Sequence, residues 1–256
     1  MTGLPSAPKA GGTRTRARPV WALALFGLLA LAGIAGLTAL GIWQLERRVW
    51  KLDLIERVDA RIHASPVPAP GPEAWPSVTA ASDEYRRVAV TGRLMNDRET
   101  LVQAVSDLGG GFWVMTPLVT DRGFTVLVNR GFVPPEKRDP ASRAEGQPQG
   151  EVTVAGLLRL TEPKGGFLRS NDPAAGRWYS RDVAAIATAA GLKDAAPYFI
   201  DADGTRSPGG WPVGGLTVVS FPNSHLGYAL TWFALDLMLV GAVLFVIRSE
   251  MRRRHI

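Results

Sequence analysis

Two long apolar runs near the ends of the chain dominate the hydropathy pattern. The first extends from Val20 to Trp43 without a charged residue, and the second extends from Leu226 to Ile247 with one charge, Asp236. At about 1.5 Å of rise per residue, a helix of either length crosses a hydrocarbon core of roughly 30 Å. The pattern therefore predicts two transmembrane helices with a long polar segment between them.

The sequence after the first run keeps a helical period of polar and apolar positions from Glu46 to Ile62, so we expect the helix to project beyond the bilayer. Residues 65–76, SPVPAPGPEAWP, then carry five prolines. Such a composition favours an extended, polyproline-like connector over a packed element.

From Glu84 onward the apolar positions recur with period two and are rich in β-branched residues, which is typical of strands. The predicted strands are 85–94, 99–105, 112–119, 124–133, 152–160, 198–202 and 216–221. One segment, 183–191, has the composition of a short helix. Closely spaced strands with few helical crossovers predict a mainly antiparallel sheet, curled into a barrel or sandwich to limit its edges.

These patterns together predict a membrane protein in which two transmembrane α-helices flank a mainly antiparallel, barrel- or sandwich-like β domain with one short helix. The expected organisation is a basic tail (1–19), a first transmembrane helix (20–43), a helical extension (44–63), a Pro-rich connector (64–82), a β-rich domain (83–222), a second transmembrane helix (223–247) and a second basic tail (248–256).

The formal net charge of +6 is concentrated in the two tails. Eight of the 29 Lys and Arg residues lie there with one acid, Glu250; outside the tails and Asp236, 21 basic residues face 21 acidic ones. The middle of the chain thus has no basic excess with which to attract nucleic acid, and we predict no nucleic-acid partner.

The basic tails also predict the orientation, because short basic flanks stay in the cytoplasm while the segment between two spans lies outside. We expect a multi-pass protein of the bacterial plasma membrane, with cytoplasmic termini, a periplasmic central domain and the lipid bilayer as its surroundings. The alternative is a mitochondrial transit peptide before Pro19, where no acidic residue occurs, although that segment is short for one.

Sequence motifs for catalysis are missing. Cysteine is absent, which excludes a thiolate nucleophile and a Cys-based zinc site. The sequence also has no P-loop, no G-x-S-x-G elbow and no group of clustered histidines. We therefore predict no catalytic residues and no enzymatic activity, although a pair of carboxylates remains open.

The strongest candidate for binding a metal centre is His225, at the start of the second span. In a helix, His225, Tyr228, Ala229, Trp232 and Asp236 share one face. His225 alone of the three histidines lies beside a span, so it could supply one axial bond to a haem but not a complete zinc or copper site. The alternative is an ordinary interfacial aromatic belt in which the histidine caps the helix.

Three further candidates, Trp43, Gln44 and Arg47, end the first span at the same interface. The arginine could meet haem propionates or lipid phosphates. Asp236 lies near the middle of the second span, where a carboxylate is costly, so it is either functional or hydrogen-bonded to the first helix, for instance to Thr38.

Two polar motifs in the β domain are given structural roles. Arg130, in VLVNRGF, is expected to pair with a carboxylate at the end of a strand. Asn171 and Asp172, which precede Pro173, are expected to form an Asx-type turn.

Read in order, the motifs resemble the surfeit locus protein 1 family of cytochrome oxidase assembly factors. The matching stretches are LGIWQLERRVWKLDLI (40–55), EYRRVAVTGRL (84–94), VLVNRGFVP (126–134), NDPAAGRWYSRD (171–182), PVGGLT (212–217) and NSHLGYALTWF (223–233). The family often has NRGW where this chain has Phe132, and Asp236 is not part of its pattern.

The resemblance implies an assembly factor for haem-copper cytochrome c oxidase that binds haem a transiently and assists its delivery to the catalytic subunit. It implies His225 as the residue that contacts haem, and the catalytic subunit as partner, with haem a synthase as a further candidate. Two alternatives stay open: a scaffold that stabilises the immature catalytic subunit without binding haem, and, from another class, a membrane-tethered periplasmic sensor or hydrolase.

Overall fold

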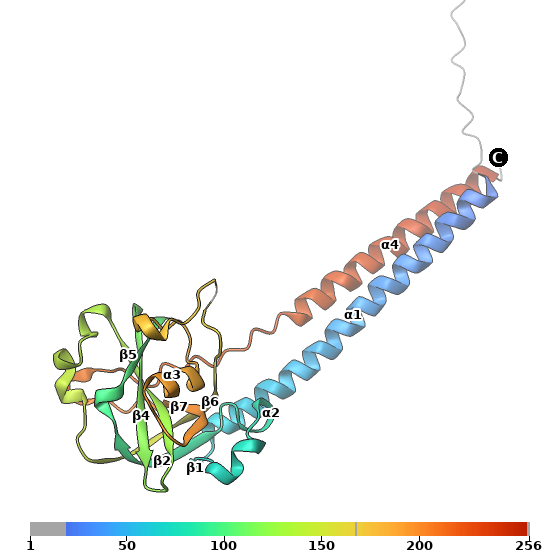
Figure 1. Ribbon diagram of the computed structural model, residues 1–256. Helices are drawn as coiled ribbons and strands as arrows, with labels where there is room; N and C mark the ends of the chain where they lie inside the picture. The colour runs from blue at the N-terminus through green and yellow to red at the C-terminus, as the bar shows by residue number, and fades with distance from the viewer. Residues whose placement is uncertain (1–18, 167, 255–256) are drawn as a thin grey trace, which may run out of the picture. The chain divides into compact units, whose positions relative to one another are not determined.

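The computed structural model describes residues 19–166 and 168–254 (Figure 1). The described chain forms two compact units, one comprising Leu54–Phe221 and the other the segments on either side of it. Most of the two predicted basic tails, residues 1–18 and 255–256, lie outside the described residues.

The central unit contains a closed β-barrel. Its strands are β1 (Val67–Pro68), β2 (Arg87–Leu94), β3 (Thr100–Ser106), β4 (Gly109–Thr120), β5 (Thr125–Val133), β6 (Glu151–Leu160) and β7 (Ala195–Ala202). The sheet order is β1-β2-β6-β7-β5-β4-β3, and an additional pairing of β2 with β4 closes it. The pairs β1–β2 and β5–β7 are parallel and the others antiparallel. A mainly antiparallel barrel is therefore confirmed.

Closure depends on Gly92 in β2, which is paired with Thr120 of β4. A Cβ atom at Gly92 would lie 2.1 Å from the carbonyl oxygen of Val119, which is too close for any side chain to fit there without a shift of the backbone. Because glycine has no side chain, β2 can approach β4 closely enough at Gly92 to pair with it.

Two apolar clusters hold this unit together. The larger contains Val88, Leu118, Val126 and Tyr198 with eight further buried residues. The smaller packs β4, β5 and β7 against the helix α3 (Val183–Ala189), with Ile186 fully buried. Every residue of β5 is buried, because this strand faces both clusters.

The Pro-rich segment is packed, which corrects the prediction of an extended connector. It contains β1, a 3₁₀ helix (Pro72–Ser77) and the short helix α2 (Ala80–Asp83). Ala69 belongs to the larger cluster, and the Trp75 ring meets Phe124 edge-on at 5.8 Å. Ala69 is buried, and Val67 and Trp75 are partly buried against the larger cluster, so the apolar residues between the prolines hold the segment to the barrel.

The predicted strand at 216–221 is wrong. Residues 214–221 have no regular secondary structure, and only Val213 forms an isolated bridge, to Phe132 of β5. Within LTVVSF, the Thr217 hydroxyl instead donates to Asp201 of β7, and Val218 is exposed.

The second unit is a pair of long helices. Helix α1 (Val20–His63) is continuous through the predicted span and its polar extension, and α4 is His225–Arg254. Both are long and apolar enough to cross a membrane. Their apolar parts lie side by side and antiparallel (Figure 1). The fold is thus two long apolar helices flanking a small β-barrel with a short helix.

Candidate functional site

A histidine–glutamine pair joins the two long helices where α4 begins. Nδ1 of His225 lies 2.7 Å from Oε1 of Gln44, which is buried on α1. Because an amide oxygen can only accept a hydrogen bond, this arrangement places the imidazole proton on Nδ1. A neutral imidazole with its proton on Nδ1 has its lone pair on Nε2, which is the nitrogen that could then bind a metal. The ring of His225 is half-buried.

The aromatic residues of the predicted site lie close to this pair along the two helices, and they differ in exposure. Tyr228 and Trp43 are exposed, at 57% and 53% of their surfaces. Trp232 is half-buried, and its Nε1–H is buried without a hydrogen-bond partner among the described residues. The three rings thus leave apolar surface exposed, and Trp232 also has an unused donor.

Arg47 lies on the polar extension of α1. Its guanidinium stacks over the ring of Trp50, with 3.9 Å between the guanidinium carbon and the ring centroid. Within the described part of the chain no hydrogen bond or ring contact joins Arg47, Trp43 or Tyr228 to His225. Gln44 is the predicted site residue that the structure brings into direct contact with the histidine.

Part of the shared face predicted for α4 lies against α1: His225, Ala229 and Asp236 do, whereas Tyr228 is exposed. Ala229 is buried, and the ring of Phe233 sits over Gly41, where an added Cβ would lie 2.5 Å from it. One turn deeper, the Thr38 hydroxyl donates to Oδ2 of Asp236 at 2.7 Å. Asp236 therefore makes the helix contact that was one of its two predicted roles.

His225 has no metal-ligating partners nearby. No group of three or more His, Asp or Glu residues that could hold a metal ion occurs within 19–166 and 168–254. His63 is exposed and pairs with Asp59 at 3.4 Å, and His255 lies outside the described residues. A single imidazole supplies too few ligands for a zinc or copper site, but it could complete a centre that already has its other ligands, as the iron of a haem does.

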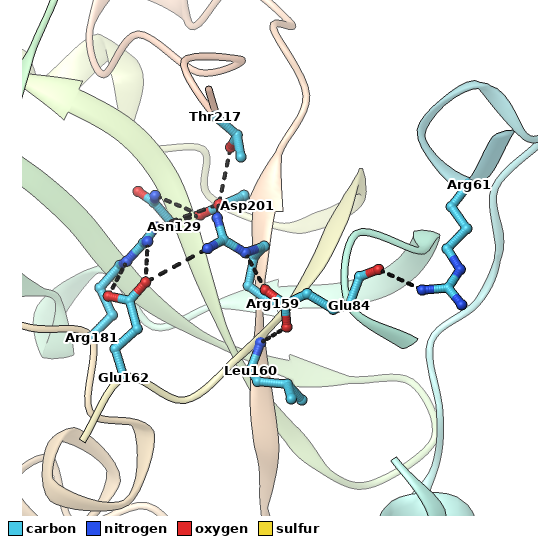
Figure 2. Close-up of polar contacts among 9 residues, drawn as sticks. All are labelled: Arg61, Glu84, Asn129, Arg159, Leu160, Glu162, Arg181, Asp201 and Thr217. Atoms are coloured by element: carbon cyan, nitrogen blue, oxygen red, sulfur yellow. Dashed lines mark hydrogen bonds and ion pairs between the residues drawn. The ribbon is translucent and has the colours of Figure 1, made fainter. Parts of the chain in front are cut away.

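A second polar site lies in the barrel and is centred on Asp201 of β7, which is 2% exposed (Figure 2). Its carboxylate accepts from Asn129 Nδ2 at 2.8 Å, Arg159 at 2.9 Å, Arg181 at 3.0 Å and the Thr217 hydroxyl at 3.0 Å. All the donors converge on one carboxylate from four separate segments of the chain. We call these five residues, with Glu84 and Glu162, the Asp201 cluster.

Two glutamates complete the Asp201 cluster. Glu84 accepts from Arg159 Nε at 2.8 Å, and Glu162 accepts from Arg181 Nε at 3.0 Å. Burial works to lower the pKa of Arg159, but the carboxylates of Asp201 and Glu84 raise it above its ordinary value. Arg159 is therefore firmly charged, and the two arginines and three carboxylates of the cluster are paired with one another.

The Asp201 cluster, apart from its two glutamates, lines a cleft of about 570 Å³, whose other lining residues include Trp113, Leu216 and Val218. The Asp201 cluster also contacts the chain segments at both ends of the barrel unit (Figure 2). Arg61, near the end of α1, donates to the carbonyl oxygen of Glu84 at 3.2 Å, and Thr217 lies on the segment that leads toward α4. The cluster thus fixes the two places where the chain enters and leaves the barrel.

Sequence reasoning missed this cluster. Its members are far apart in the chain and come from positions that alternate with apolar residues in ordinary strand patterns. One signal was available: in the predicted strand 198–202, YFIDA, Asp201 follows three apolar residues, and a carboxylate in a buried strand needs cationic partners.

The polar motifs singled out in the β domain have mixed outcomes. Among residues 19–166 and 168–254, Arg130 pairs with no carboxylate, so that prediction is wrong. It donates to the carbonyl oxygen of Gly146 and, at 3.5 Å, to Oδ1 of Asn96. The Asx-type turn is confirmed, since Oδ1 of Asp172 accepts from Ala175 N at 3.1 Å. Oδ1 of Asn171 accepts from two backbone amides, of which Tyr179 N is nearer, at 2.8 Å.

The fold and the site define a protein with two candidate membrane helices and, between them in the sequence, a small β-barrel. Where the second of these helices begins, a histidine contacts a glutamine of the first. Comparison with known proteins agrees with this class. The model of the SURF1 family matches residues 31–237, and the chain belongs to that family.

Similar proteins cover most of the chain. Surfeit locus protein 1 of Homo sapiens is 40% identical over 214 residues, which are 77% of this chain and 69% of the human protein. The protein of the same name from Gallus gallus is 36% identical over 247 residues, 89% of this chain and 76% of its own length. A SURF1-like protein of Monosiga brevicollis is 36% identical over 223 residues, 82% of this chain and 83% of its own length.

Proposed function

We propose that this chain is a non-enzymatic assembly factor for haem-copper cytochrome c oxidase, and that it binds haem a beside His225 on the way to the catalytic subunit. Membership of the SURF1 family, a family of oxidase assembly factors, supports the first part. The second part rests on the contact between His225 and Gln44.

That contact supports haem binding because it prepares one ring nitrogen. Gln44 holds the proton on Nδ1, so Nε2 of His225 is available without loss of a hydrogen bond elsewhere. Haem would supply an iron that can bind a histidine nitrogen and a broad apolar ring. Tyr228, Trp43 and Trp232 would hold the apolar ring, and Arg47 would leave Trp50 to meet a propionate.

The proposed location is a bacterial plasma membrane, with both termini in the cytoplasm and the barrel in the periplasm. The two candidate membrane helices and the basic flanks of the sequence support this topology. The proposed partners are the oxidase catalytic subunit and, as the source of the cofactor, haem a synthase.

The test is an absorption spectrum of the detergent-solubilised protein, purified from cells that make haem a. We expect a Soret band that His225→Ala weakens at least tenfold and that His63→Ala leaves unchanged, because His63 is exposed on the far end of α1. The same two variants should be compared for the amount of assembled oxidase in membranes.

Other outcomes select other functions. Colourless protein that still co-purifies with the catalytic subunit, with oxidase assembly unaffected by His225→Ala, contradicts haem binding and supports a scaffold. A deletion strain with a normal oxidase spectrum contradicts the assembly role altogether and would favour a periplasmic sensor or hydrolase.

A further inference from the structure

A small cavity at one end of the barrel is separate from both sites described above. It has a volume of about 180 Å³ and is lined by the ends of β2 and β7, the start of β6 and the middle of β5. Its apolar walls include Val128 and Val154, which also contact the larger apolar cluster. The loop after β7 lines it with the hydroxyl-bearing residues Thr205 and Ser207, and the cavity opens to solvent.

The cavity has an excess of positive charge. Its charged lining residues are Arg130, Arg206 and Asp203. The carboxylate of Asp203 is already paired with Arg87, whereas neither Arg130 nor Arg206 makes an ion pair within the described residues. Two cations therefore border this space without a carboxylate of their own.

Of the two arginines, Arg130 has the greater need for a counter-ion, because it is only 9% exposed. Its hydrogen bonds go to neutral acceptors, the carbonyl oxygen of Gly146 and the amide oxygen of Asn96. The nearby carboxylate of Glu99 is held by a bidentate contact from Arg143. Burial lowers the pKa of Arg130 to about 10, so the group is still cationic at neutral pH.

A buried cation without a counter-ion is costly, and an anion in the adjoining cavity would offset that cost. We propose that the cavity binds a compact oxyanion, a phosphate or a carboxylate. Arg130 and Arg206 provide the charge, and the hydroxyls of Thr205 and Ser207 provide further donors. The planar guanidinium of Arg206 suits two oxygens of one such group, whereas Arg130 contributes mainly its buried charge.

The size of the cavity limits the ligand class. At about 30 Å³ per water molecule, 180 Å³ corresponds to roughly six waters, which is room for a small oxyanion and part of its hydration. Cavities for nucleotides or porphyrins are several times larger. The site is thus independent of the proposed haem site and does not rest on the proposed function.

The test is calorimetric titration of the full-length, detergent-solubilised protein at neutral pH with sodium phosphate, and separately with sodium acetate, against sodium chloride of equal ionic strength. Arg206→Ala should weaken binding of the preferred anion roughly tenfold, the loss expected for one charge-assisted contact. Arg206 is exposed and makes no contact that folding requires among the described residues. Preference for phosphate or for acetate distinguishes the two classes.

The matched control is Arg138→Ala, which removes the same charge from an exposed arginine of a different cleft. It should leave the affinity unchanged. Arg130→Lys, with the fold checked by its thermal midpoint, should weaken binding as well. The proposal is overturned if neither anion binds above the chloride background, or if Arg138→Ala weakens binding as much as Arg206→Ala, which would indicate an adventitious ion only.

Discussion

The hydroxyl of Thr38 donates a hydrogen bond of 2.7 Å to the carboxylate of Asp236, joining α1 to α4 between two apolar surfaces. The other oxygen of Asp236 is buried without a partner among the described residues. Because hydrocarbon offers no alternative donor, this single contact carries most of the compensation for placing a carboxyl group between the helices.

We expect Thr38→Val, which keeps the shape of the side chain and removes the donor, to destabilise the helix pair by roughly 0.6–1.7 kcal/mol. The measurement is the midpoint of unfolding in a detergent–SDS titration. Thr231→Val is the control, because Thr231 is exposed and bonds only to carbonyls of its own helix. Equal effects of the two substitutions would contradict a role for the contact between the helices.

A second prediction concerns the approach of the two helices at Gly41. An added methyl group there would lie 2.5 Å from the Phe233 ring, whereas nothing lies within 4 Å of one added at Gly36. We expect Gly41→Ala to cost about 1–3 kcal/mol from overpacking, and Gly36→Ala to be neutral or slightly stabilising. The same SDS titration measures both. If Gly41→Ala is neutral too, the helices do not pack at this contact.

The third prediction tests how Gln44 orients His225. Gln44→Leu removes the acceptor at Nδ1, so the imidazole proton is free to move to Nε2. We expect about a tenfold to hundredfold loss of haem a affinity, as for other residues that orient a metal-ligating histidine. Titration of the apoprotein with haem a, followed at the Soret band, measures this loss.

Gln44→Glu separates orientation from packing. A carboxylate accepts from Nδ1 as the amide oxygen does, so this variant should retain most of the affinity that Gln44→Leu loses. Equal losses in both variants would show that the glutamine packs against its neighbours and does not set the tautomer.

The fourth prediction concerns the Asp201 cluster. Asp201→Asn preserves shape but leaves Arg159 and Arg181 with only their glutamates, so we expect a loss of about 3 kcal/mol in the free energy of unfolding. Thermal unfolding followed by circular dichroism at strand wavelengths measures it. Asp172→Asn, in an exposed ion pair with Arg177, should produce little change.

The fifth prediction is a pH dependence. Burial acts to raise the pKa of Asp83, but hydrogen bonds from Ser82, the Thr79 amide and Arg86 bring it below its ordinary value of 3.8. The stabilisation is therefore complete above pH 3.8 and is lost as the pH falls through the lower pKa of the folded state. Asp83→Asn should lower the thermal midpoint at pH 6, and the difference from the natural chain should shrink below pH 3.8. A difference that does not change with pH would contradict this assignment.

The sequence was most informative where a physical pattern is local. Apolar runs such as Val20–Trp43 identify long helices because each residue contributes to the same signal, and β-branched alternation identified six of the seven strands. The seventh observed strand, Val67–Pro68, is only two residues long and lies among prolines, where composition favours the opposite interpretation.

Contacts between distant segments were not predictable in the same way. The pairing of Gln44 with His225 depends on the register of two helices 181 residues apart, although each residue was a candidate on its own. The Asp201 cluster depends on barrel closure, which no single strand encodes. Thr217 was assigned to a strand because its neighbours alternate, while in the structure its hydroxyl is bound to Asp201.

The contacts made by Arg61 and Thr217, at the two ends of the barrel unit, determine where a soluble fragment should be cut. A fragment trimmed at the end of α1 would lack Arg61 and its contacts with the carbonyl oxygens of Glu84 and Ala81. One that stops before Thr217 would lose a donor to Asp201. For expression without detergent, the natural cut points are therefore Leu54 and Phe221, so that a short amphipathic stub of α1 stays with the barrel.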